Sequence, residues 1–193
     1  VKDEQGTIWL GTYFGGVNYF NPEYEIYTRY KTGDTEKEGL SSPIVGRMTE
    51  DKDGNLWICT EGGGVNVYDR KNNTYRWYRH EEGKNSISHN NVKAIYYDRT
   101  NEIMWIGTHL GGLNKLDLRT NRFTAYRMKA GDPTSLPSDI VRDIVPYKDK
   151  LVVATQNGVC LFNPATGACQ QLFKETKEGR GIGMVASLYI DKD

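Results

Sequence analysis

The chain has 193 residues, and its 25 Lys and Arg balance its 25 Asp and Glu, so the formal net charge at neutral pH is zero. Phosphate backbones bind basic surfaces, so this balance argues against nucleic acid as the main partner. Hydrophobic residues make up 37% of the chain, and no run approaches the ~20 apolar residues of a membrane-spanning helix.

A Gly-rich motif recurs along the chain. Three copies centre on Trp residues spaced 48 residues apart, namely Trp9, Trp57 and Trp105. Each of these copies ends in a Gly pair, whose second members are Gly16, Gly64 and Gly112. In a fourth copy, Val152 stands where the others carry Trp. A fixed period of this length is typical of repeat architectures, in which each unit is completed by its neighbours.

The second copy shows how one repeat is built. Residues 45–50 read as a strand, 51–55 as a tight turn in which Asp and Gly supply the side-chain bond and the positive φ, and 56–60 as a central, apolar strand. After a Gly turn, residues 65–68 and 74–79 read as two further strands, the last one rich in aromatics. Four short strands in every 48 residues predict one blade of a β-propeller.

The predicted fold class is therefore all-β, with propeller blades of four antiparallel strands. We expect one propeller segment over residues 1–193: strands two to four of a first blade at 6–30, then blades at 44–79, 91–127 and 140–173, and the inner strand of a further blade at 184–190. The end of the chain repeats the Asp-Lys-Asp of residues 51–53. We therefore expect an excerpt of a longer, seven-bladed propeller, although four blades could also close. The Trp residues are expected to fill the gaps between blades.

The motif itself has the form Asp-x-x-Gly-x-Leu-Trp-Ile-Gly-Thr-x-x-Gly-Gly-Leu-Asn and spans residues 3–18, 51–66 and 98–114 with small departures. It resembles the two-component regulator propeller repeats. The inner-strand signature Val-[Arg/Lys]-x-Ile occurs at 92–95 and 141–144. The resemblance covers the whole chain, but the fourth copy lacks the Trp and one Gly, and the third has one extra residue before Trp105.

Such repeats are similar to those of hybrid two-component sensors. In that family, paired propellers form the periplasmic sensor, followed by an immunoglobulin-like domain, a membrane span, a histidine kinase and a response regulator. Its members typically sense carbohydrate fragments and control polysaccharide-utilisation genes. The resemblance thus implies a periplasmic, ligand-sensing part of a kinase anchored in the inner membrane, with an oligosaccharide as ligand, neighbouring blades or a second copy as partners, and no enzyme activity in the segment itself.

Repeat phase predicts the face where a ligand would bind. The turn after the second strand and the loop after the fourth strand lie on the same face of a propeller, and variable loops on a rigid scaffold commonly bind ligands. The long polar loops are 31–43, 79–90, 128–138 and 174–183. The turn residues after a nearly constant Thr vary, and we take them as ligand-binding candidates: Tyr13, Glu61, His109 and Gln156. Basic residues of the inner strands are possible helpers: Arg47, Lys93 and Arg142. Aromatic and polar side chains together suit a sugar.

Two other functions compete with ligand sensing. Streptogramin-lyase-like propellers share Gly-Asn-Leu-Trp blades and use a metal with His and Glu, and Asp-box glycosidases also repeat Asp, Gly and Trp. Here the His residues fall at different repeat phases, and the Asp-box spacing fails because Asp53 directly precedes Gly54. The third hypothesis is a platform for protein–protein contact or dimerisation that binds no ligand. We expect no cofactor and no metal, since no acidic residue closes the calcium-like loop that starts at Asp51.

The chain has three cysteines, Cys59, Cys160 and Cys169, without metal-ligand spacing. We expect them to be small, buried or half-buried thiols. A bridge between Cys160 and Cys169 across one hairpin is conceivable, but the expectation is that they stay unbridged.

Overall fold

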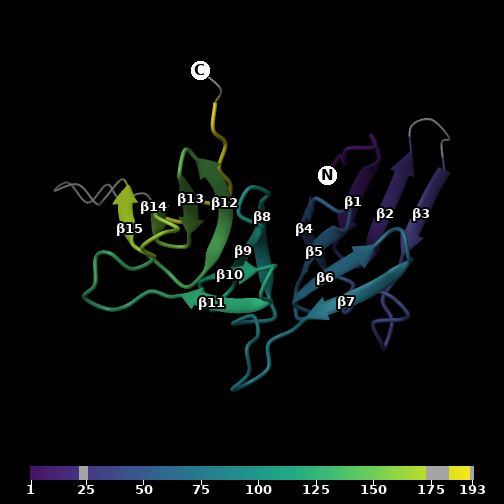
Figure 1. Ribbon diagram of the computed structural model, residues 1–193, viewed down its shortest axis with the longest axis horizontal. Helices are drawn as coiled ribbons and strands as arrows, with labels where there is room; N and C mark the ends of the chain where they lie inside the picture. The colour runs from purple at the N-terminus through teal and green to yellow at the C-terminus, as the bar shows by residue number, and fades with distance from the viewer. Residues whose placement is uncertain (22–25, 173–182, 192–193) are drawn as a thin grey trace. The chain divides into compact units, whose positions relative to one another are not determined.

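The computed structural model describes residues 1–21, 26–172 and 183–191, in which every regular element is a strand. The strands form four antiparallel sheets, each a meander of neighbouring strands (Figure 1). The all-β fold with propeller-type blades is thus confirmed. The chain divides into two compact units: residues 1–92 with 99–101, and residues 93–98 with 102–193. Each unit is described by itself below.

The first unit holds two blades. Blade 1 has the strands β1 (Ile8–Thr12), β2 (Gly16–Asn21) and β3 (Ile26–Tyr30). Blade 2 has the strands β4 (Val45–Glu50), β5 (Leu56–Thr60), β6 (Val65–Asp69) and β7 (Thr74–Tyr78). All five residues of β5 are buried, as expected for a central strand, whereas β7 has no fully buried residue.

The second unit holds two complete blades, apart from Val92 at the start of the first strand. Blade 3 has the strands β8 (Val92–Asp98), β9 (Ile103–Thr108), β10 (Leu113–Asp117) and β11 (Arg122–Tyr126). Blade 4 has the strands β12 (Val141–Tyr147), β13 (Lys150–Thr155), β14 (Gly158–Phe162) and β15 (Cys169–Leu172). The bounds of all four sheets lie within those expected from the repeat.

Residues 184–190 differ from the expectation, because they form no strand. A strand needs a neighbour that satisfies its backbone groups along its whole length. This segment is held to blade 4 by individual hydrogen bonds: Val185 N–H donates to the Thr155 carbonyl (3.2 Å), and Asp143 Oδ2 accepts the Leu188 N–H (2.7 Å) and the Ser187 hydroxyl (3.2 Å). It therefore runs beside the blade without extending a sheet.

The Trp residues of the first and third repeats lie between blades, as expected. Trp9 is buried in a cluster that joins blade 1 to Leu56 and Ile58 of blade 2. Trp105 is buried in a cluster that joins blade 3 to Val153 and other residues of blade 4. Trp57 is also buried, and its ring stacks on Tyr78 at 5.4 Å between centroids. The three indoles thus occupy equivalent places in their sheets and bury a large apolar area.

The Asp that opens the motif holds the indole as well as the turn. Asp51 Oδ2 accepts a hydrogen bond from Trp57 Nε1 (2.8 Å), while Asp51 Oδ1 accepts the backbone N–H groups of Asp53 and Asn55. Asp3 does the same for Trp9 Nε1 (2.7 Å). The sequence indicated the turn bond but not the bond to the indole.

The second Gly of each Gly pair has a geometric reason. Gly16, Gly64 and Gly112 all have φ between +74° and +77°. A Cβ atom on each would lie within 2.2 Å of the carbonyl oxygen of the last outer-strand residue, namely Tyr30, Tyr78 or Tyr126. Only Gly fits both conditions, so the outer strand can cross closely over the turn.

Candidate functional site

In blades 2 and 4, the variable turn lies against the loop that precedes the inner strand, as the repeat phase predicts. In blade 2, Ser41 Oγ donates to the Gly63 carbonyl (2.8 Å) and Ser42 Oγ donates to the Glu61 carbonyl (2.7 Å). In blade 4, the Gln156 N–H donates to the Ile140 carbonyl (3.0 Å). In these two blades, the loop before the inner strand therefore supports the turn that carries a candidate residue.

The constant Thr before each candidate has a structural task. Its hydroxyl donates to the carbonyl of the Gly that ends the turn, at 2.8–3.0 Å in all four blades. These hydroxyls belong to Thr12, Thr60, Thr108 and Thr155. The turn is thus fixed by its Thr and its Gly, and the residue between them is free to vary.

In the first unit, the candidates differ in exposure. Tyr13 is 66% exposed and meets the equally exposed Phe14 edge to face, at 4.6 Å between ring centroids. Glu61 is half-buried, and Arg47 is exposed. These two adjacent aromatic rings form an exposed apolar patch on a tight turn.

In the second unit, the structure brings two of the predicted residues together. Arg142 Nε and Nη2 both donate to Gln156 Oε1, at 3.1 and 2.6 Å. Lys93 and His109 are half-buried. The Gln156 amide and the Arg142 guanidinium each have further N–H donors, which suit a ligand with several hydroxyl groups.

The helper residues do not share one register. Lys93 and Arg142 are the second residues of their inner strands, whereas Arg47 is the third, and Gly46 stands in the second position of β4. The residues equivalent to Arg47 are Ala94 and Asp143, and both are buried. Arg47 is therefore not structurally equivalent to Lys93 and Arg142, although the sequence analysis grouped the three as basic residues of inner strands.

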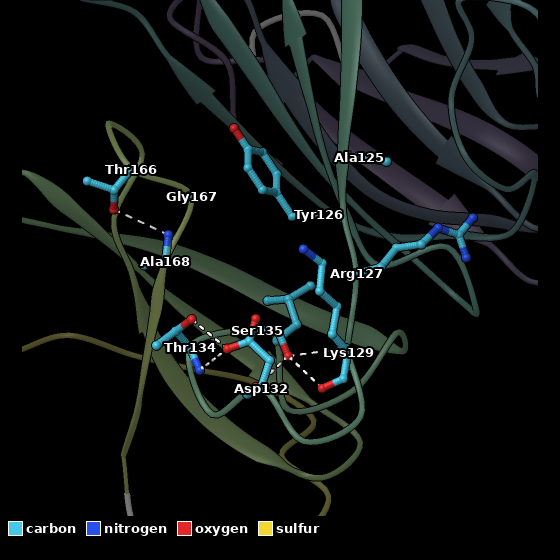
Figure 2. A pocket seen from close by; sticks show the side chains of 11 residues that line it. Ala125, Tyr126, Arg127, Lys129, Asp132, Thr134, Ser135, Thr166, Gly167 and Ala168 are labelled. Atoms are coloured by element: carbon cyan, nitrogen blue, oxygen red, sulfur yellow. Dashed lines mark hydrogen bonds between the residues drawn. The ribbon is translucent and has the colours of Figure 1, made fainter.

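A pocket of about 250 Å³ lies on the second unit, between the end of β11, the loop after it and the turn that joins β14 to β15 (Figure 2). Tyr126, Lys129, Asp132 and Thr134 contribute its polar groups, and Thr166 faces them from the turn. Figure 2 shows the Tyr126 ring on one side and the side chains of Asp132, Thr134 and Ser135 gathered on another. The loop was predicted as a ligand-binding element, but these residues were not singled out.

The pocket wall is built by the loop itself. Asp132 Oδ1 accepts both the N–H (2.9 Å) and the hydroxyl (2.6 Å) of Thr134, and Ser135 Oγ accepts the Lys129 N–H (2.9 Å). The Thr134 carbonyl accepts the N–H of Cys169, which ties the loop to the outer strand β15 (2.7 Å). The hydrogen bonds that Thr134 donates to Asp132 hold the pKa of its carboxyl below the ordinary value, so Asp132 is anionic at neutral pH.

Comparison of the two units explains why the space is open here. Tyr126 and Leu136 correspond to Tyr30 and Leu40 of the first unit, but Ala125 stands where the first unit has Arg29. In the adjoining blade, strand pairing shows that Cys169 takes the place of Tyr75. Gly167 takes the place of Asn73, whose Oδ1 accepts the Tyr68 hydroxyl at 3.0 Å.

Small residues thus replace large ones at three equivalent positions around the pocket. A Cβ atom on Gly167 would lie 2.6 Å from the Tyr126 ring, so the bare glycine lets this turn approach the aromatic wall. The signal was present in the sequence, but it appears only when repeats are aligned by strand pairing.

Within residues 1–21, 26–172 and 183–191, no three or more His, Cys, Asp or Glu side chains are arranged to hold a metal ion. In the same part of the chain, no helix is long and apolar enough to cross a membrane. The loop expected at 174–183 lies outside the described residues, apart from Gly183.

Comparison with known proteins identifies the repeats. Residues 39–62 and 86–109 match the family profile of the two component regulator propeller. Each match begins in the long loop and ends in the turn after the second strand, so the profile includes the inner strand and the Trp. The resemblance to these repeats is thereby confirmed. No curated protein sequence matches the chain.

Several solved structures share the fold. One is the extracellular domain of BT3049 from B. thetaiotaomicron, named as a hybrid two component system, with 22% identity and a TM-score of 0.76 over 89% of this chain. Another is the extracellular domain of BT4673 from the same organism, also named as a hybrid two component system, with 25% identity and a TM-score of 0.70 over 90% of this chain. A third is PorZ, a surface component of the type-IX secretion system of Porphyromonas gingivalis, with 19% identity and a TM-score of 0.63 over 88% of this chain.

The chain spans only about a quarter of the length of these structures, 24% of the first two and 26% of the third. Two segments of the chain thus match the two component regulator propeller profile, and the three structures above are two extracellular domains named as hybrid two component systems and one bacterial surface protein.

Proposed function

We propose that these two-component regulator propeller blades are part of the extracytoplasmic sensor region of a hybrid two-component system. In this proposal the parent chain is anchored in the inner membrane and carries a histidine kinase that controls transcription. The segment itself binds ligand and catalyses no reaction. The family match at residues 39–62 and 86–109 and the extracellular domains among the structural neighbours support this assignment.

The ligand class that we propose is a carbohydrate fragment. The observation that carries it is the pocket of the second unit, which Tyr126, Lys129 and Asp132 line together. An aromatic ring packs against the C–H face of a sugar, an ammonium donates to hydroxyl oxygens, and a carboxylate accepts from hydroxyl groups. A volume of about 250 Å³ is below the 300–1,000 Å³ of sites for drug-sized ligands, so it suits about one sugar ring.

Each unit also has candidates of its own on its variable turns, and we include them in the proposal unit by unit. Tyr13 with Phe14 offers an aromatic surface, and Gln156 with Arg142 offers amide and guanidinium donors. We assign these residues, with Glu61 and His109, to oligosaccharide contact. The competing functions differ in what they predict. A propeller enzyme would convert a substrate to product, whereas a contact platform would bind a protein partner and no sugar.

Isothermal titration with a panel of monosaccharides and oligosaccharides tests the proposal. We expect saturable binding by at least one sugar, and a loss of about tenfold or more in affinity in Lys129→Ala or in Ala125→Arg, which places the side chain of the first unit in the pocket. Lys71→Ala removes an exposed ammonium on a turn of the first unit and serves as the matched control.

A second pair of variants tests the variable face. Glu61→Ala with His109→Ala should weaken binding of longer sugars without lowering the melting temperature. Turnover of a sugar would favour the enzyme hypothesis instead. Absence of binding across the panel, together with self-association or capture of a defined protein partner, would favour the contact platform.

A further inference from the structure

Two cysteines of blade 4 lie against each other inside the second unit. Cys160 is in β14, and Cys169 is the first residue of β15, the strand that pairs with it. Their sulfur atoms are 3.0 Å apart. Both side chains are buried, with exposed fractions of 0% and 6%. Two of only three cysteines in the chain thus meet on one face of one hairpin.

Comparison of the repeats shows that the residue at the position of Cys160 forms hydrogen bonds in blade 2 that are not possible in blade 4. Its counterpart in blade 2 is the buried Asn66, whose Oδ1 accepts the Ser41 N–H (2.8 Å) and whose Nδ2 donates to Ser41 Oγ (2.7 Å). The residue before blade 4 that corresponds to Ser41 is Pro137, which has neither an N–H nor a hydroxyl. An Asn at position 160 would therefore lack both of these partners.

Cys169 is likewise a replacement confined to this blade. Strand pairing places it at the position of Tyr75 in blade 2 and Phe123 in blade 3, opposite Tyr68 and Leu116 respectively. Blade 4 therefore differs from its neighbours at two positions that share one face, and both changes produce cysteine. Neither thiol supports a hydrogen-bond network or an aromatic cluster of the kind found in the other blades.

We propose that Cys160 and Cys169 form a disulfide that closes the outer hairpin of blade 4 when the chain folds in the presence of a disulfide oxidant. In this step the two thiols lose two electrons and two protons, and a new S–S bond forms. The oxidant is a small-molecule or protein disulfide, whose own S–S bond breaks and which leaves as two thiols. This departs from the expectation that the two cysteines stay unbridged, and the distance between the sulfurs is the reason.

The bond requires a small movement of the hairpin. A disulfide needs its sulfurs about 2.05 Å apart and its Cβ atoms about 3.5–4.5 Å apart. Cys160 pairs with Gln171 and Cys169 with Phe162, so the cysteines are diagonal neighbours, which in general are farther apart than opposed residues. Cys169 directly follows a turn that contains Gly167 at φ +76°, and this end of the strand can shift by about an ångström with least loss of pairing.

The same surroundings make the bond a structural one. The adjacent Cys169 thiol and burial both raise the pKa of Cys160, so the folded blade holds little thiolate. Since the thiolate is the attacking species, exchange is slow once the blade has packed. The bond therefore forms before packing is complete and then resists reduction. Cys59 is equally buried, and burial raises the pKa of its thiol as well, but it has no such neighbour and stays a thiol.

The occurrence of this bond in the cell rests on the proposed extracytoplasmic location, where disulfides persist. Its chemistry can be tested on the purified chain without that assumption. The chain is unfolded with reductant, refolded in a mixture of reduced and oxidised glutathione, and unfolded again in an excess of a maleimide reagent near neutral pH. We expect one modified cysteine and an intact mass lower by about 2 Da before labelling; after reduction all three cysteines react.

Matched variants assign the bond. Cys59→Ser should leave no reactive thiol, whereas Cys160→Ser and Cys169→Ser should each abolish the mass loss. Reductant should lower the Tm of the natural chain by roughly 5 °C but leave that of Cys160→Ser unchanged. Three reactive thiols after refolding, or a glutathione adduct in place of the mass loss, would overturn the proposal. The same count on chain isolated without reductant covers the case in which refolding fails, and a lack of sugar binding changes none of these numbers.

Discussion

A buried indole N–H needs an acceptor, and the copies of the motif differ in whether they supply one. Asp3 and Asp51 lie six residues before their Trp and accept its Nε1–H. Asp98 lies seven residues before Trp105, and in the described part of the chain Trp105 Nε1 has no hydrogen-bond partner. The extra residue in the third turn moves the carboxylate out of reach.

Replacement of Trp by Phe should therefore cost different amounts at the two positions. Trp57→Phe removes a satisfied bond and leaves Asp51 with one donor fewer, whereas Trp105→Phe removes a buried, unsatisfied N–H. We expect Trp57→Phe to lower the free energy of unfolding by about 1–3 kcal/mol more than Trp105→Phe, as measured by urea denaturation. Equal costs at both positions would show that the Asp bond contributes nothing measurable.

The carboxylate of Asp3 makes the first blade sensitive to acid. Burial alone would raise the pKa of Asp3, but hydrogen bonds from Trp9, the Thr7 N–H and Arg70 outweigh it and hold the pKa below its ordinary value of 3.8. A lowered folded-state pKa stabilises the fold fully above the unfolded-state pKa, and this stabilisation is lost as pH falls through the folded-state value. We expect unfolding free energy to fall below about pH 4, with a smaller slope in Asp3→Asn. An identical slope in the variant would contradict this.

At the scale of the element, blades 1 to 3 depend on the close crossing of the outer strand over the Gly turn. Gly62 and Gly64 lie in the same turn of blade 2 and both have φ near +80°. A Cβ atom on Gly62 would meet nothing closer than 4.0 Å, whereas one on Gly64 would lie 2.1 Å from the Tyr78 carbonyl oxygen. The turn thus provides a matched pair of positions that separates backbone strain from steric conflict.

Gly62→Ala should lower the free energy of unfolding by about 1 kcal/mol, the ordinary cost of a left-handed alanine. Gly64→Ala should lower it by at least about 2 kcal/mol more, because β7 must move away from the turn. Urea denaturation monitored by tryptophan fluorescence measures both. Similar losses in the two variants would mean that the outer strand tolerates the displacement.

The first three blades were predictable because each is specified locally, by a Trp, a Gly pair and turn residues that recur at one period, and the fourth followed from its place in that period. Features that depend on contacts outside a single repeat could not be predicted from this pattern. Residues 184–190 match an inner strand in sequence but pair with no strand in the described part of the chain. The pocket beside Tyr126 depends on the absence of bulk at Ala125 and Gly167, which a search for reactive residues overlooks.

For the molecule as a whole, one face of blade 1 lacks the cover that the other blades have. Leu10 is 48% exposed, whereas the three residues at the same position of their sheets are at most 1% exposed. These residues are Ile58, Ile106 and Val153. Ile58 and Val153 each belong to a cluster that includes the Trp of the preceding blade, Trp9 and Trp105 respectively. Leu10 therefore presents an apolar surface that suits the same kind of packing against a neighbouring blade.

This difference predicts opposite outcomes for the same substitution in two blades. Leu10→Lys should change the free energy of unfolding of this chain by less than about 0.5 kcal/mol, because the ammonium remains in water. Ile58→Lys should unfold blade 2, because a charge would be buried without a partner. Leu10→Lys should also reduce any self-association seen by sedimentation, since it removes apolar surface from the bare face. Strong destabilisation by Leu10→Lys would show that this face is already covered within the 193-residue chain.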